Sequence, residues 1–223
     1  VLPLLLHGTP HNALYLGVGT GATLSAALQF PSLSVRGVEI SPEVVSLIPA
    51  FVTPPRRDPS AAVLLSDARR YLAAGGPQYD VIVADNFHPA LEGSGSLYSR
   101  EHFLNVRSRL AARGVFCQWL PLYQLSTTSL RDIVRTYQSV FPSASGWLAH
   151  FSVRMPMLAL CARADDAPLE PSPNKVLPTD AHLVALLAQL GWSDGMALSG
   201  AWIADARALK RYAGAGQLNT DDH

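Results

Sequence analysis

The chain has 223 residues, of which 48% are hydrophobic and 15% are charged. This length and composition allow one large buried core, with room for a small appendage. The 17 basic and 17 acidic residues balance, so no net field draws the chain to nucleic acid or anionic lipid, and a small ligand is favoured. The apolar opening at 1–6 is too short to span a bilayer and follows no basic region, so we expect neither a membrane helix nor a signal peptide there.

The two cysteines, Cys117 and Cys161, both lie in apolar runs. Such positions favour buried, reduced thiols, which are typical of a cytoplasmic protein. No group of cysteines and histidines has the spacing of a zinc site, so the sequence predicts no metal centre.

Strand-like and helix-like patterns alternate along the chain. In chain order they predict a strand at 13–18, a helix at 23–30, a strand at 34–40, a helix at 41–51, a strand at 62–67, a helix at 68–75, a strand at 79–85, a helix at 99–114, a strand at 115–120, a helix at 129–141, two hairpin strands at 146–153 and 155–162, and helices at 180–191 and 202–214. Ser41 is the expected N-cap of the second helix, and Pro42 its first residue.

Strands joined by crossover helices require a parallel sheet, because parallel neighbours cannot be connected by a tight turn. We therefore expect a doubly wound α/β fold with a mostly parallel sheet, ending in an antiparallel hairpin. The expected organisation is a nucleoside-binding domain at 1–164, a linker at 165–178, and a small helical appendage at 179–223 packed on the domain. In this topology the hairpin strand with Cys161 lies beside the strand with Cys117, so the thiols are expected to be close but unbonded.

The first strand runs into LGVGTGAT, where Gly17, Gly19 and Gly21 allow a sharp turn and close approach of a ligand. An ordinary strand-to-helix connection is the alternative. Ligands of such sheets bind beyond the carboxyl ends of the strands, which makes this turn a candidate site. The spacing differs from the dinucleotide fingerprint G-x-G-x-x-G, which lowers the case for NAD.

Acids finish the next three strands. Glu39 can accept hydrogen bonds from ribose hydroxyls, or be a solvated acid. Asp67 can accept from an adenine amino group, with the N–H of Ala68 beside it, and can also be a helix N-cap. Asp85 ends the fourth strand. Together with the glycine turn, these acids indicate an adenosine pocket without a pyrophosphate.

From Leu2 to about Ala164, the chain resembles the spermidine synthases, the polyamine aminopropyltransferases, which share the fold of class I methyltransferases. The matching stretches are LPLLLHGTPHNALYLGVGTGATL, VEISPEVV, DARRYL, YDVIVAD, SLYSREHF and CQWLPL, in that order. GVGTGAT, LYSREHF and the terminal LNTDDH are closer still to bacterial spermidine-synthase-like proteins in which this domain is often fused to membrane segments.

The resemblance implies decarboxylated S-adenosylmethionine, or S-adenosylmethionine itself, as co-substrate. The glycine turn, including Thr20, would hold the thioadenosine and the methionine-derived part, Glu39 the ribose, and Asp67 with Ala68 the adenine. Asp85 would contact the co-substrate and act as the general base. In the implied reaction, an amine attacks the carbon next to a sulfonium, so a base must first deprotonate the ammonium.

Two departures from the family concern the binding of charged amines. Typical spermidine synthases have an Asp in the glycine turn that binds the ammonium of the aminopropyl arm, where this chain has Thr20, and a second Asp that anchors the far end of the diamine, where this chain has His88. Each charge-assisted bond lost would cost on the order of 1.5–3 kcal/mol, so putrescine is doubtful as a substrate. The tyrosine that the family offers to the polyamine and its N-terminal β-hairpin are also missing.

Five residues are candidates for binding the acceptor: His88, Tyr98, Gln118, Trp119 and Tyr123. His88 is either a turn residue or a binding and proton-relay group beside Asp85, and metal ligation has no second ligand to support it. The last three residues are either an acceptor wall or ordinary packing of an aromatic rim.

Three functions stay open at this point. The favoured one is aminopropyl transfer to a small amine other than or beyond putrescine. The others are methyl transfer from S-adenosylmethionine and a catalytically idle nucleoside-binding module. The expected location is the cytoplasm. The resemblance leaves open a homodimer and a membrane tether outside this chain.

Overall fold

The computed structural model describes residues 1–52, 59–85, 94–150 and 154–222. Its strands are β1 Asn12–Leu16, β2 Ser34–Glu39, β3 Val63–Leu65, β4 Tyr79–Ala84, β5 Leu110–Pro121, β6 Ser145–His150, β7 Met157–Arg163 and β8 Trp202–Ala204. Its α-helices are α1 Leu2–His7, α2 Ala22–Leu28, α3 Pro42–Phe51, α4 Ala68–Ala73, α5 Arg100–Ser108, α6 Thr127–Val140, α7 Ala181–Gln189, α8 Gly195–Ser199 and α9 Ala206–Ala213. Short 3-10 helices are η1 Ser60–Ala62, η2 Ser94–Tyr98 and η3 Leu122–Gln124.

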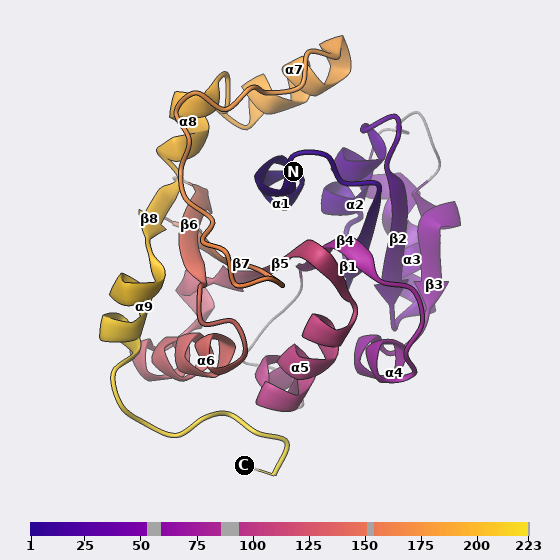
Figure 1. Cartoon of the computed structure of the whole chain (residues 1–223). Helices are drawn as coiled ribbons and strands as arrows, with labels where there is room; N and C mark the ends of the chain where they lie inside the picture. The colour runs from indigo at the N-terminus through magenta and orange to yellow at the C-terminus, as the bar shows by residue number, and fades with distance from the viewer. Residues whose placement is uncertain (53–58, 86–93, 151–153, 223) are drawn as a thin grey trace.

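The strands form one twisted sheet in the order β3-β2-β1-β4-β5-β7-β6-β8 (Figure 1). The first five of these are parallel to their neighbours, and β7, β6 and β8 pair antiparallel. The predicted fold class, a mostly parallel α/β sheet with a hairpin formed by β6 and β7, is confirmed.

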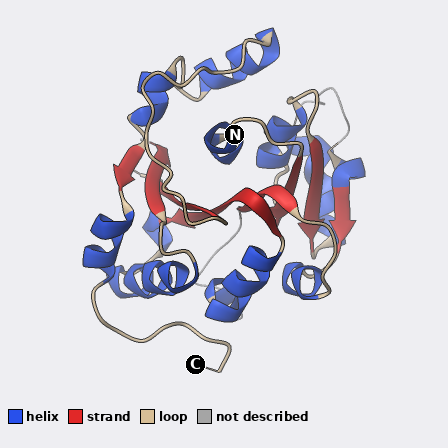
Figure 2. Cartoon of the chain, in the orientation of Figure 1, coloured by secondary structure: helices blue, strands red, loops and turns tan. Residues whose placement is uncertain are grey.

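Helices cover both faces of the sheet (Figure 2). In the view of Figure 1, α4, α5, α6 and α9 lie below the sheet, on what we call the lower face, and α1 and α2 lie above it, on the upper face. The lower core joins Phe103 of α5 and Tyr137 of α6 to Phe116 of β5. The upper cores include Leu5 of α1 and Leu24 of α2. The parallel strands are thus buried on both sides, as such sheets require.

The cysteines occupy directly opposite positions on β5 and β7. Cys117 is the register partner of Cys161, and both side chains are fully buried with free thiols. The prediction that the thiols are close but unbonded is confirmed by this structure. Burial raises the pKa of Cys161, so its thiol stays protonated and unreactive.

Two expected element boundaries were wrong. The helix predicted to end at Gly114 ends at Ser108, because the buried Arg109 side chain turns back and donates to the carbonyls of Tyr71, Leu72 and Pro77 at 2.8, 3.2 and 3.0 Å. The chain then enters β5 at Leu110, five residues before Val115, where the strand was expected to start. A buried cation held by three backbone carbonyls thus sets this boundary, which helix periodicity did not predict.

The expected helix at 202–214 is also wrong in its first part. Trp202–Ala204 form β8, which pairs with β6 and becomes an edge of the sheet. The helix α9 starts only after Asp205, whose carboxylate accepts from the N–H of Ala208 at 2.6 Å as an N-cap. The predicted cap at Ser41 is confirmed, since its hydroxyl accepts from the N–H of Val44 at 3.2 Å.

The segment after α9 crosses the lower helices. The carbonyl of Asn219 accepts from the N–H of Arg100 at 2.9 Å, and its amide donates to the carbonyl of Gly95 at 2.8 Å. Asp221 forms an ion pair with Arg69 of α4. The terminal LNTDD stretch therefore ties η2 to the helices beneath the sheet.

Candidate active site

The predicted co-substrate residues lie along one edge of the sheet. The carboxyl ends of the five parallel strands share this edge. The glycine turn follows β1, Glu39 ends β2, Asp67 stands two residues after β3, and Asp85 follows β4 directly. Ligands of doubly wound sheets bind beyond this edge, which makes it the candidate site.

The glycine turn requires its glycines. Gly17, Gly19 and Gly21 have φ values of 76, 51 and 79°, in the left-handed region that other residues rarely adopt. A Cβ on Gly21 would also stand 2.7 Å from Cγ2 of Ile48, whereas a Cβ on Gly19 would meet no atom within 4 Å. The exposed Gly19 and Thr20 therefore present an open stretch of backbone to a ligand.

Glu39 holds this turn in place. Its Oε2 accepts from the N–H groups of Val18 and Gly19 at 2.9 and 3.3 Å, and its Oε1 accepts from those of Ile40 and Ser41 at 2.9 and 3.1 Å. The residue is 9% exposed. A carboxylate has about four acceptor positions, and backbone N–H groups use four here. The structure thus gives Glu39 a scaffolding role that the sequence did not suggest.

Asp67 and Ala68 form the start of α4. One carboxylate oxygen of Asp67 accepts a hydrogen bond from the N–H of Arg70 at 2.8 Å. The alternative role expected for this residue, a helix N-cap, is therefore observed. Beside it lies an open hollow of about 420 Å³, lined also by Ile40 and Leu65.

Sequence reasoning missed these two apolar residues. Ile40 is 68% exposed and Leu65 is 54% exposed. Large aliphatic side chains left exposed at the ends of two neighbouring strands offer an apolar surface to a ligand. Their signal in the sequence was an aliphatic residue immediately after Glu39 and another two residues before Asp67.

Asp85 is joined to both β1 and α2. Its N–H donates to the carbonyl of Leu16 at 3.3 Å, and its Oδ2 accepts a hydrogen bond from the hydroxyl of Thr23. Burial raises the pKa of the Asp85 carboxyl, and the Thr23 bond lowers it. A raised pKa improves the match between a carboxylate base and the proton of an ammonium group.

The candidates for an acceptor wall do not come together. Gln118 is 1% exposed and points to the lower face, where its Nε2 donates to the carbonyls of Ala84 and Trp119 at 3.4 and 3.1 Å. Trp119, the next residue of β5, packs against the upper cores, because successive strand residues face opposite sides. Tyr123 is 51% exposed in η3. His88 lies outside the described residues, so its proposed roles stay predictions.

Tyr98 belongs to a separate cavity of about 540 Å³ beyond the carboxyl ends of β4 and β5. Gln124, Asp132, Ile133 and Asn219 also line it. The hydroxyl of Tyr98 and Oε1 of Gln124 are buried and have no hydrogen-bond partner among the described residues. Buried polar atoms without partners are rare, so a ligand or water with matching groups is expected there.

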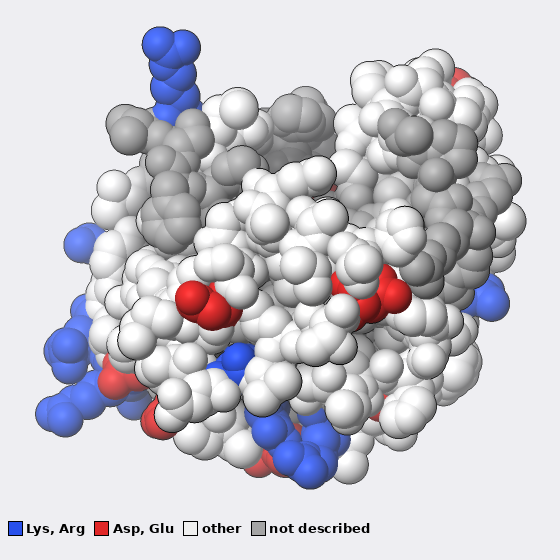
Figure 3. Space-filling model, turned by 90° about the horizontal axis from the view of Figure 1, so that it is seen from above, with Lys and Arg blue, Asp and Glu red and all other residues white. Residues whose placement is uncertain are grey.

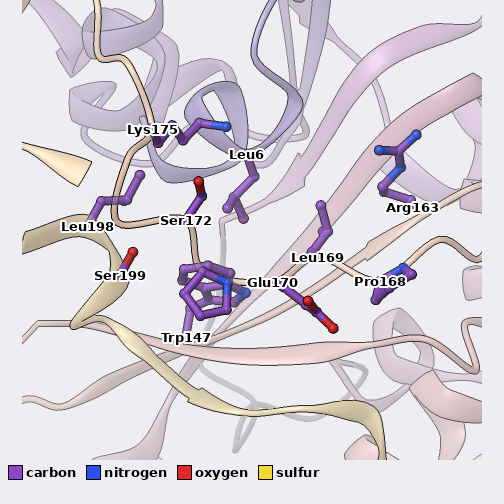
Figure 4. A pocket seen from close by; sticks show the side chains of 11 residues that line it. Leu6, Trp147, Arg163, Pro168, Leu169, Glu170, Ser172, Lys175, Leu198 and Ser199 are labelled. Atoms are coloured by element: carbon purple, nitrogen blue, oxygen red, sulfur yellow. The ribbon is translucent and has the colours of Figure 1, made fainter. Parts of the chain in front are cut away.

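A second, smaller cavity lies elsewhere. It encloses about 160 Å³ between Trp147, Lys175 and Leu6 (Figure 4). Arg163 on its rim is the register partner of Val115, near the amino ends of the parallel strands. This cavity is therefore remote from the strand-end edge, and none of the predicted site residues lines it.

Neither a metal centre nor a membrane span is found in the part of the chain that the structure describes. Its Cys, His, Asp and Glu side chains form no group of three or more that could hold a metal ion. Its helices are all too short or too polar to cross a bilayer. On the face drawn in Figure 3, uncharged side chains cover most of the described surface, and the charged ones are dispersed.

The sheet order and the helices on both of its faces define a class of fold, the α/β fold with a mostly parallel sheet that is shared with class I methyltransferases. A spermidine synthase from Thermotoga maritima superposes with a TM-score of 0.68 at 18% identity, over 91% of this chain and 68% of that one. Human methyltransferase-like protein 13, in complex with SAH, superposes with a TM-score of 0.56 at 23% identity, over 99% of this chain and 90% of that one.

The family is narrower than the fold. The Spermine/spermidine synthase domain model matches residues 1–155, and the chain belongs to this family. Polyamine aminopropyltransferases from Synechococcus strains JA-2-3B'a(2-13) and JA-3-3Ab are 31% and 30% identical to it, over 75% and 86% of this chain. The aligned parts span 55% and 65% of those relatives' lengths.

Proposed function

We propose that the chain transfers an aminopropyl group from decarboxylated S-adenosylmethionine to a small amine. The observation that carries the proposal is the position of Asp85, which follows β4 and is bonded to the first turn of α2, just after the glycine turn. A base in this place adjoins the open backbone where a sulfonium nucleoside would lie. Membership of the spermidine synthase family supports aminopropyl transfer over methyl transfer.

In the proposed complex, the adenine lies in the hollow between Ile40 and Leu65, with its amino group near Asp67. The ribose lies by Glu39, and the glycine turn carries the sulfur and the aminopropyl arm. The oxygens of Glu39 also accept from backbone N–H groups, so a ribose hydroxyl that bonds to Glu39 has to share them. The glycine turn and the nucleoside are then held by the same carboxylate.

The proposed reaction is a single displacement. Asp85 removes a proton from the acceptor's ammonium group, and the freed nitrogen lone pair attacks the methylene carbon next to the sulfonium. The carbon–sulfur bond breaks, and its electron pair stays on sulfur, which gives neutral methylthioadenosine. The carboxylate is fixed by a rigid strand end, so the nitrogen can be held in line with the bond that breaks.

The other end of the acceptor is proposed to reach the cavity at Tyr98. Asp132, whose Oδ1 also pairs with Arg135 at 2.7 Å, is the charged residue among its described lining, and Oε1 of Gln124 can only accept hydrogen bonds. A second amine of the acceptor would supply the missing donors. Putrescine is expected to be a poor acceptor, since neither Thr20 nor His88 supplies the carboxylate found at these positions in typical family members.

The test compares turnover of a panel of amines, including putrescine, by wild type, Asp85→Asn and His88→Asp. Asp85→Asn should abolish transfer and leave methylthioadenosine binding largely intact, while His88→Asp should raise turnover of putrescine. Asp194→Asn is the control for the loss of a carboxylate, because Asp194 is the N-cap of α8, far from the site, and asparagine can also cap a helix. Full turnover in Asp85→Asn would exclude Asp85 as the base, and methyl transfer from S-adenosylmethionine by wild type would favour the runner-up activity.

A further inference from the structure

Thr23 makes a contact that the proposed reaction does not yet explain. It is the second residue of α2, two positions after Gly21, and its hydroxyl donates to Oδ2 of Asp85, 62 residues away in the sequence. The hydroxyl lies at a half-buried position on the upper face. A bond between the helix that begins at the glycine turn and the acid that ends β4 joins the two halves of the candidate site.

We propose that Thr23 is a positioning residue for the base: its hydroxyl holds Oδ2 of Asp85 and thereby turns Oδ1 toward the amine. This inference rests on the proposed function. Oδ2 has Thr23 as its partner, and Oδ1 makes no hydrogen bond with the described residues. Among the described residues, the carboxylate thus has one oxygen anchored and the other without a hydrogen bond. Thr is β-branched and stiff at χ1, so it fixes the anchored oxygen more firmly than a flexible side chain would.

Among the described neighbours of Asp85, Thr23 is the one that can orient its carboxylate. Tyr15 of β1 is an ionisable group near the carboxylate on the upper face. Its hydroxyl is buried and unpartnered in the described structure, and burial raises its pKa, so it stays neutral. Thr23 is the neighbour that donates a hydrogen bond to the carboxylate.

The hydroxyl also affects when the base is ionised. A donor bound to a carboxylate stabilises its charged form, and here it opposes the effect of burial on the pKa of Asp85. Without Thr23's donor, the carboxyl would hold its proton to a higher pH. The Thr23 hydroxyl therefore affects both the orientation of Asp85 and the pH at which Asp85 is ionised.

The experiment compares wild type with Thr23→Val, which keeps the shape but removes the hydroxyl, and Thr23→Ser, which restores it. In Thr23→Val the acidic limb of the kcat/KM profile should move up by about one pH unit, and kcat should fall on the plateau while methylthioadenosine affinity holds. Thr23→Ser should recover most of both. Ser25→Ala, two residues along α2, removes a buried hydroxyl that has no partner in the described structure and should change neither.

A direct titration separates this inference from the proposed function. The carboxyl carbon of Asp85, followed by ¹³C NMR against Asp85→Asn, should titrate about one unit higher in Thr23→Val than in wild type. If this pKa shift occurred in a protein without transferase activity, it would support the hydrogen bond from Thr23 to Asp85 and refute the proposed reaction. An unchanged titration, or a Thr23→Val enzyme with a wild-type pH profile, would overturn the inference.

Discussion

Replacing Glu39 by glutamine tests whether the glycine turn depends on a single carboxylate. Glutamine keeps one acceptor oxygen and puts an NH₂ group in the place of the other, so two of the four backbone N–H groups lose their acceptor. The amide should turn its oxygen to the buried N–H of Val18, because water can reach the exposed Ile40 more easily. Because this rearrangement keeps the buried N–H of Val18 paired, we expect the free energy of unfolding to fall by no more than about 2–4 kcal/mol.

Urea unfolding followed by circular dichroism measures this loss, and calorimetric titration with methylthioadenosine measures its consequence for binding. We expect affinity to fall at least about tenfold, or roughly 1.4 kcal/mol, because the loosened turn must be ordered again by the ligand. Glu43→Gln is the matched control, since the carboxylate of Glu43 is exposed on α3 and accepts from the Ser41 hydroxyl.

Unchanged unfolding in Glu39→Gln would refute the scaffolding role of Glu39. If affinity alone were lost, Glu39 would act only on the ribose. If stability alone were lost, the nucleoside would lie elsewhere along the strand-end edge. The two measurements therefore separate the role that the structure displays from the role that the family resemblance implies.

Two further predictions concern the cavity and the thiols. Gln124→Leu and Tyr98→Phe should each raise the KM of the acceptor several-fold, by about 1 kcal/mol, with kcat and methylthioadenosine affinity nearly unchanged; an unaltered KM for every amine in the panel would place the acceptor elsewhere. In peptide mapping of the non-reduced protein, Cys117 and Cys161 should both be recovered as free thiols after denaturation and alkylation, and a quantitative link between them would contradict the reduced pair.

Most of the order of strands and helices could be predicted, because it depends on local patterns, whereas α1, α8 and β8 were not predicted. Apolar runs such as 79–84 bury both faces, and Ser41 and Pro42 mark a helix start by their own chemistry. The end of α5 could not be predicted, because Arg109 binds carbonyls more than thirty residues away in sequence. The periodicity of a helix sequence gives no information about partners that are so distant in the sequence.

The candidate site was predictable for a similar reason, and only in part. Strand-end positions follow from the topology, so Glu39 and Asp85 reach the same edge once the strands are assigned. The direction of each side chain depends on register, which a sequence does not display at the end of a strand. This is why the contact from Thr23 to Asp85 appears only in the structure. The opposite orientations of Gln118 and Trp119, in contrast, follow from strand alternation once β5 is assigned.

That alternation has a consequence for specificity. Asp85 reaches the upper face through Thr23, whereas Tyr98 and Gln118 belong to the lower side of the sheet. An acceptor that gives its nitrogen to Asp85 and its far end to the cavity at Tyr98 has to pass around the carboxyl ends of β4 and β5. The length of that path would then contribute to the choice of amine. We therefore expect changes on the lower side to alter which amine is bound, and changes around Asp85 to alter how fast any amine reacts.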